Sequence, residues 1–159
     1  MNPPLFSNLW KNHPGPGDAA KPETYPCDRP LFENQCAIRM GVALEASGID
    51  TTSFNVRRCS KVYPALKSHA PGHILAAQEL ADALDHYSRL HWLKRALKLK
   101  GSLHTNRSQL GSQKGIIFIQ NGWGATDHID LWDGTSRKFR GGGSTFDLVG
   151  QYIWFWQLT

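Results

Sequence analysis

Three cysteines and seven histidines are the side chains of this sequence best suited to covalent chemistry. The cysteines are Cys27, Cys36 and Cys59. Cys36 lies in residues 32–50, where apolar residues recur at helical spacing, Asn34 can cap the start and Gly48 follows the end. A thiol on the first turn of a helix meets backbone N–H groups and the positive end of the helix dipole, which favour the thiolate. Cys36 is therefore the candidate nucleophile, and a buried, inert cysteine is the competing interpretation.

His128 is the best candidate for the partner base. It opens an expected strand directly after the glycine-rich stretch at 121–124, a setting that can leave an imidazole at the edge of a cleft. A cysteine on a helix and a histidine on a later strand form a papain-type pair, in which the imidazole takes the thiol proton and later protonates the leaving amine.

A third group must orient that imidazole. Asp130 lies two residues after His128 and hence on the same face of the strand. Three further aspartates stay open as alternatives: Asp127, Asp133 and Asp147. The oxyanion hole is expected from the Cys36 backbone N–H together with a second donor, for which Gln35 and Asn34 are the candidates.

Metal and cofactor sites are not expected. No pair of cysteines has the C-x-x-C spacing of a zinc or redox site. His69 and His73 are four residues apart, but Pro71 and Gly72 between them break the helix that would bring both rings to one face. The two remaining thiols form a disulfide or are two small buried apolar groups, and the sequence supports both interpretations about equally.

The elements that position these residues indicate a single catalytic domain over residues 1–159. Residues 1–30 hold seven of the nine prolines and form an extended arm, residues 31–100 a helical half and residues 101–159 a sheet half. We expect an α+β fold, with N-terminal helices packed on an antiparallel sheet.

Within these halves, residues 73–100 have the longest helical periodicity and predict one long helix. Its basic C-terminal end is expected to complement the helix dipole. Strands are predicted at 115–120, 128–132 and 152–158, with a tight turn at Asp133-Gly134.

The composition restricts the partners. The net charge of +5 favours anionic polymers or acidic substrates. The sequence carries no recognisable nucleic-acid-binding pattern, and its apolar runs are far shorter than the roughly 20 residues that cross a bilayer, so neither nucleic acid nor membrane insertion is expected. Prolines near the N-terminus replace the apolar stretch of a signal peptide, so export through the general secretory route is not expected.

Five segments of the sequence carry a specific pattern: NQCAIRMGVAL at 34–44, GHILAAQELADAL at 72–84, GIIFIQNGWG at 115–124, DHIDLWDG at 127–134 and the aromatic YIWFWQL at 152–158. Together they resemble the fourth family of type VI secretion amidase effectors. The segments occur in the family's order. In better-known members an aspartate follows the histidine after an HxxLWxG turn, and here Phe139 stands near that place. The third member is therefore Asp130, Asp133, Asp147 or absent.

The resemblance implies a papain-like cysteine amidase with Cys36 as nucleophile and His128 as base. Its implied substrate is the peptidoglycan stem peptide, cut between γ-D-glutamate and meso-diaminopimelate. It also implies delivery by the type VI apparatus to the periplasm of a rival bacterium, and a cognate immunity protein that blocks the cleft. Arg39 is a candidate for binding a substrate carboxylate, and Trp123 for a wall of the groove.

Two alternative functions stay open. One is a non-catalytic module that binds an anionic cell-wall polymer. The other is acyl transfer to, or deamidation of, a protein by the same Cys–His pair. Product analysis distinguishes both from hydrolysis of the cell wall.

Overall fold

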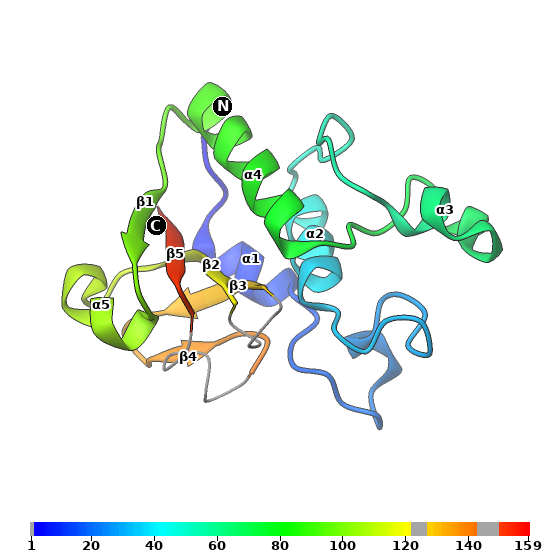
Figure 1. The fold of residues 1–159 in the computed structure, drawn as a ribbon, viewed down its shortest axis with the longest axis horizontal. Helices are drawn as coiled ribbons and strands as arrows, with labels where there is room; N and C mark the ends of the chain where they lie inside the picture. The colour runs from blue at the N-terminus through cyan, green and yellow to red at the C-terminus, as the bar shows by residue number, and fades with distance from the viewer. Residues whose placement is uncertain (1, 122–126, 143–149) are drawn as a thin grey trace.

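A five-stranded antiparallel sheet forms the centre of the computed structural model, which describes residues 2–121, 127–142 and 150–159 (Figure 1). The strand order is β1-β5-β2-β3-β4. The strands are β1 (Leu97–Lys100), β2 (Lys114–Gln120), β3 (His128–Asp133), β4 (Lys138–Phe139) and β5 (Tyr152–Leu158). The apolar residues of β2 alternate between two cores, because successive side chains point to opposite faces.

Helices cover both faces of this sheet. α1 (Phe6–Asn12), α2 (Cys36–Ala46) and α4 (Ala77–Tyr87) share the larger core with Ile116 and Phe118 of β2. α5 (Leu103–Leu110) packs on the opposite face, where Ile117 and Ile119 point. Figure 1 shows α2 and α4 on one side of the sheet and α5 on the other. The structure confirms the α+β class, with helices packed on an antiparallel sheet.

The connection between α2 and α4 has little regular structure. It holds α3 (Cys59–Val62) and the 3₁₀ segment η2 (Pro64–His69). A small satellite core packs beneath it, built from Ile38 of α2 with Cys27, Cys59 and Leu66. In Figure 1, α3 lies apart from the sheet, beyond α2.

The prediction of one helix over residues 73–100 is wrong in its second half. The helix α4 ends at Tyr87, and a π-helical turn follows at Ser88–Trp92. Leu93 then adopts a left-handed conformation with φ of 52°, and the Leu-Lys-Leu-Lys stretch that follows pairs with β5 as strand β1. The basic cluster therefore does not end a helix: Lys98 pairs with Asp85 at 3.0 Å and lies over the Trp154 ring.

The other predicted elements lie close to where the sequence placed them. The three predicted strands correspond to β2, β3 and β5, and the turn after Asp133 leads into β4. The N-terminal arm contains the short helix α1 and a 3₁₀ turn, η1 (Pro22–Thr24). The start of α1 is connected to the C-terminus by the hydrogen bond from the Phe6 N–H to the Thr159 carbonyl. No helix among the described residues has the length and apolarity needed to span a membrane.

Candidate active site

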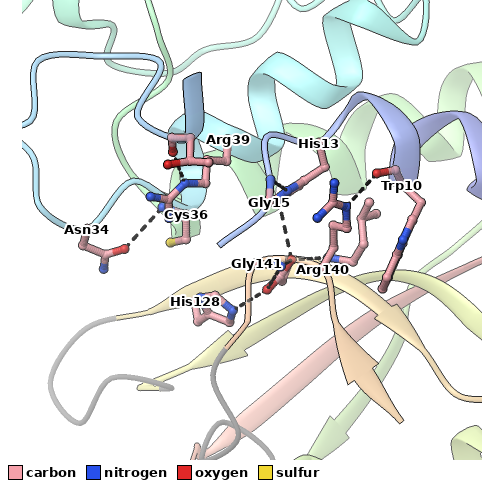
Figure 2. Close-up of polar contacts among 12 residues, drawn as sticks. Trp10, His13, Gly15, Asn34, Cys36, Arg39, His128, Arg140 and Gly141 are labelled. Carbon is pink, nitrogen blue, oxygen red and sulfur yellow. Dashed lines mark hydrogen bonds and ion pairs between the residues drawn. The ribbon is translucent and has the colours of Figure 1, made fainter. Parts of the chain in front are cut away.

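Cys36 and His128 are brought together because α2 packs against β3. Cys36 is the first residue of α2 and His128 the first residue of β3. The Cys36 thiol lies close enough to the His128 imidazole to help raise its pKa, and its Sγ lies 3.8 Å from the carbonyl oxygen of Asp127. Figure 2 shows the thiol and the ring facing each other. The structure thus places the predicted nucleophile at a helix start and next to the predicted base.

Asp130 holds the other side of the imidazole. Its Oδ2 lies 3.0 Å from His128 Nε2, which leaves Nδ1 of the ring for the thiol. The two residues are on the same face of β3, as their spacing predicted. Both side chains are almost completely buried, so bulk water does not compete for these bonds. The imidazole therefore lies between the Cys36 thiol and the Asp130 carboxylate, and it is hydrogen-bonded to the carboxylate.

Backbone donors hold the Asp130 carboxylate in place. The Leu131 N–H donates to Oδ1 at 2.8 Å, and the Gly141 N–H donates to Oδ1 and Oδ2 at 2.8 and 3.0 Å. Position 141 has room only for glycine, because a Cβ there would lie 2.7 Å from Asp130 Oδ2. The segment after β4 thus approaches closely enough to orient the carboxylate toward His128.

His13 is a fourth polar group at this site, and the sequence did not indicate it. Its Nε2 lies 3.6 Å from Asp130 Oδ1, and its Nδ1 accepts a hydrogen bond from the Gly15 N–H at 3.0 Å. Burial lowers the pKa of His13 to about 4, so the ring is neutral near pH 7 and carries its proton on Nε2, toward the carboxylate. Arg140 fastens the same arm by donating from Nε to the Trp10 carbonyl (Figure 2).

The electrostatics of the site favour a charged His128. Burial works against the imidazolium, but the hydrogen bonds and charges of Asp130 and Cys36 outweigh burial and raise the pKa of His128 to about 9. At neutral pH the ring is therefore protonated, and an imidazolium beside a thiol stabilises the thiolate. This charge state is the one that a cysteine nucleophile requires.

A groove of about 260 Å³ opens onto the thiol and the imidazole. Arg39 lines it one helical turn after Cys36 and is buried rather than exposed. Its Nε donates to the Thr24 carbonyl at 2.8 Å, and its guanidinium lies 5.1 Å from the centre of the Tyr25 ring. The arm thus fixes a cation at the wall of the groove.

Two side chains next to Cys36 have different surroundings. Gln35 is completely buried, and its Nε2 donates to the carbonyls of Cys27 and Phe32, so both amide protons have protein partners. In this arrangement Gln35 does not line the groove, and neither amide proton is available to an oxyanion without breaking a backbone contact. Asn34 does line the groove, and its Oδ1 accepts the Cys36 N–H at 3.3 Å.

The remaining predicted residues fall elsewhere. Trp123 and Asp147 lie outside the described residues. Asp127 accepts the Asn121 N–H, and Asp133 accepts N–H groups of the turn that follows it, so neither contacts the imidazole through these bonds. Phe139 packs edge-on against the His128 ring, with 6.0 Å between the ring centres. An apolar side chain therefore contacts the imidazole near the place where better-known family members have an aspartate as the third catalytic residue.

A larger depression of about 880 Å³ lies between residues 53–57 and α4. Its lining includes Glu79, His86 and His91 but no cysteine. It is separate from the groove at Cys36 and offers no thiol nucleophile. Size alone therefore does not identify the reactive site.

Comparisons with known proteins agree with this geometry. The sequence profile of Tae4, described as type VI secretion system (T6SS) amidase effector protein 4, matches residues 32–156. The chain belongs to this family. It is therefore an amidase effector of a family of peptidoglycan amidases, and the resemblance seen in the sequence is confirmed. A comparison with curated protein sequences finds no match.

Solved structures of Tae4 proteins have the same fold. Tae4 from Enterobacter cloacae superposes with a TM-score of 0.66 at 18% identity over 100% of both chains. The effector–immunity complex Tae4–Tai4 from the same organism gives 0.64 at 17% identity, covering 99% of both chains. The Tae4/Tai4 system from Salmonella typhimurium gives 0.63 at 21% identity, covering 99% of this chain and 100% of the other.

Proposed function

We propose that this amidase effector cuts its substrate with Cys36 as nucleophile, His128 as acid and base, and Asp130 as the group that orients the imidazole. The observation that carries the proposal is that Cys36, His128 and Asp130 line one groove, with the imidazole hydrogen-bonded to Asp130 and its pKa raised by Cys36 and Asp130. The position of Cys36 at the N-terminus of α2 adds the favourable end of a helix dipole.

The reaction begins with attack of the Cys36 thiolate on the amide carbonyl carbon. A C–S bond forms, and the carbonyl π electrons move to oxygen. In the structure the Cys36 N–H donates to Asn34 Oδ1 over a long 3.3 Å. The oxyanion is a stronger acceptor, so this N–H can donate to the oxyanion instead when the intermediate forms. The Asn34 amide at the rim of the groove is a candidate for the second donor.

Collapse of this intermediate breaks the C–N bond. The imidazolium of His128 gives its proton to the leaving amine nitrogen and becomes neutral, and the acyl group stays on sulfur as a thioester. His128 then removes a proton from water, and the resulting hydroxide attacks the thioester carbon. The C–S bond breaks, the carboxylic product leaves, and the thiolate–imidazolium pair is restored. Asp130 keeps its hydrogen bond to Nε2 throughout and so holds the imidazole in one orientation.

The substrate bond is the amide between γ-D-glutamate and meso-diaminopimelate of the peptidoglycan stem. Stem peptides carry free carboxylates, and the groove presents the fixed guanidinium of Arg39. Arginine binds carboxylates with two parallel hydrogen bonds, so Arg39 would fix the register of the stem. The net charge of +5 adds a weaker, salt-sensitive attraction to the anionic wall.

The site of action is the periplasm of a target bacterium, reached through the type VI apparatus. Related Tae4 proteins are found in effector–immunity complexes with Tai4. We infer an equivalent immunity protein for this chain in the producing cell. It would protect that cell by covering the groove at Cys36.

Digestion of muropeptides, followed by mass spectrometry, tests the proposal. The wild-type protein should add one water per stem and release fragments that begin with diaminopimelate. Cys36→Ala should release none, whereas His104→Gln, on the exposed face of α5, should match the wild type. Products that persist in Cys36→Ala would overturn the nucleophile assignment. An adduct on a protein, with muropeptides left intact, would indicate acyl transfer instead, and binding without products would indicate a binding module.

A further inference from the structure

Four potential metal ligands converge in the satellite core beneath α3, away from the Cys36 groove. Cys27, Cys59, His69 and His73 each contribute one ligand atom, and all four atoms lie within 4.8 Å of one another. Cys27 and Cys59 are buried, and the two histidines are partly buried. They come from four separate segments: the N-terminal arm, α3, the end of η2 and the loop before α4.

We propose that these four side chains form a structural zinc site. The distances between ligand atoms support it. Sγ of Cys27 and of Cys59 each lie 3.7 Å from His69 Nδ1, and Sγ of Cys59 lies 3.6 Å from His73 Nδ1. A tetrahedral Zn²⁺ with Zn–S of about 2.3 Å and Zn–N of about 2.0–2.1 Å requires a sulfur–nitrogen separation of about 3.6 Å. These three sulfur–nitrogen separations therefore match a zinc coordination sphere, and all four ligand atoms lie within 4.8 Å of one another.

The ligand types select the metal. Two thiolates and two imidazoles in a tetrahedral arrangement favour Zn²⁺ over hard cations, which prefer oxygen ligands. Four protein ligands fill the tetrahedron and leave no position for a substrate or a reactive water, which is the pattern of a structural rather than a catalytic zinc.

The local backbone is built to hold two of the ligands. Arg58 and Ile74 form an isolated antiparallel bridge, so Cys59 lies opposite His73. The His73 N–H donates to Cys59 Sγ at 3.2 Å, and the Cys59 N–H donates to the His73 carbonyl at 3.0 Å. An N–H bond to the sulfur is the kind of outer contact that orients a thiolate ligand.

Gly72, which lies between His69 and His73, allows the chain to turn so that His73 pairs with Cys59. Its φ is +96°, and a Cβ at this position would collide with Ser60. Pro71 and Gly72, which the sequence interpretation took as a reason against a histidine pair, instead form the loop that brings His69 and His73 together. Their ring centres are 5.4 Å apart and their planes nearly perpendicular.

The zinc would stabilise a part of the molecule that has little core of its own. The satellite core contains four buried apolar residues, and two of them are the cysteines. A metal crosslink replaces missing apolar burial in such small regions. The site also reaches the catalytic helix, because Gln35 binds both the N–H and the carbonyl of Cys27 and directly precedes Cys36.

Zinc content and cobalt spectroscopy test this proposal independently of any enzymatic activity. Reduced wild-type protein, dialysed against metal-free buffer after purification with Zn²⁺, should retain one zinc per chain. Replacement by Co²⁺ should give the intense visible bands and the sulfur-to-cobalt charge-transfer absorption of a tetrahedral site with thiolate ligands. Cys27→Ser and His73→Gln should each bind Zn²⁺ at least about 100-fold more weakly, since they remove a ligand itself.

The third cysteine supplies a matched control. Cys36→Ser removes one thiol outside the cluster and should retain one zinc per chain with an unchanged cobalt spectrum. Wild-type protein that binds no zinc when reduced, or that gives a weak six-coordinate cobalt spectrum, would overturn the proposal without requiring any variant to fold. So would thiol titration that finds a Cys27–Cys59 disulfide in protein purified without reductant and no zinc uptake once the bond is reduced.

Discussion

Replacing Asp130 by asparagine is expected to remove the charge that keeps His128 protonated. The asparagine side chain keeps the size of the aspartate and an oxygen that can accept the Gly141 N–H, but it has no negative charge to offer Nε2. Burial alone lowers the pKa of a histidine. The substitution therefore isolates the electrostatic part of the Asp130 contact.

The size of the effect follows from the pKa of His128. A rise from the ordinary 6.5 to about 9 corresponds to about 3 kcal/mol in favour of the imidazolium. Without the carboxylate only Cys36 still opposes burial, so the pKa should fall well below 9 and the charged fraction of the imidazole at pH 7.5 should fall with it. The asparagine amide also favours the wrong tautomer of the ring. We expect kcat/KM to fall by about 10²–10⁴-fold.

The pH dependence of kcat/KM for muropeptide cleavage, and of Cys36 alkylation by iodoacetamide, measures this directly. In the wild-type protein the alkaline limb should have its midpoint at about 9. In Asp130→Asn the midpoint should move clearly below 9, because only Cys36 then opposes burial. Asp133→Asn, on the last residue of the same strand, is the control and should keep the wild-type profile. An alkaline limb that stays at about 9 in Asp130→Asn would refute the reasoning.

Four further changes follow from the same contacts. Gly141→Ala places a Cβ 2.7 Å from Asp130 Oδ2 and should displace the carboxylate, so kcat should fall by about tenfold or more. An unchanged kcat would show that the segment around residue 141 can shift to accommodate the methyl group without disturbing Asp130. His13→Phe keeps a ring but leaves the buried Gly15 N–H without its acceptor, so urea unfolding should show a loss of about 1–3 kcal/mol. Arg39→Met should raise KM about tenfold while kcat stays within twofold of the wild type, and the KM of Arg39→Lys should lie between those of the wild type and Arg39→Met. Equal KM values in the wild type and Arg39→Met would show that Arg39 does not bind substrate. The raised pKa of His128 should stabilise the folded protein by on the order of 3 kcal/mol below pH 6.5, and this contribution should disappear as the pH rises through about 9; urea unfolding of wild type and Asp130→Asn across that range checks it.

The sequence predicted the reactive residues better than it predicted what surrounds them. Cys36 could be placed at a helix start from apolar spacing, and the two-residue step from His128 to Asp130 fixed their common face on one strand. Both inferences use only local geometry. The contact between α2 and β3 is tertiary, and the resemblance to a family, rather than any spacing, indicated it.

The missed features are ones that tertiary packing decides. His13 reaches Asp130 from an arm whose prolines and glycines give no periodic signal. The Leu-Lys-Leu-Lys stretch fits a helical period as well as a strand, and pairing with β5 decides for the strand. The metal-ligand cluster was missed because Pro71 and Gly72 were taken to separate His69 from His73, and because no local pattern connects Cys27 to Cys59.

Trapping the covalent intermediate tests the central claim most directly. The protein is mixed with muropeptides, quenched in acid within the first turnover, digested and mapped by mass spectrometry. We predict an acyl adduct on the peptide that contains Cys36, lost on treatment with hydroxylamine as expected for a thioester and absent in Cys36→Ala. An adduct on Cys27 or Cys59 would contradict the account. So would a Cys36→Ala protein that still cleaves muropeptides.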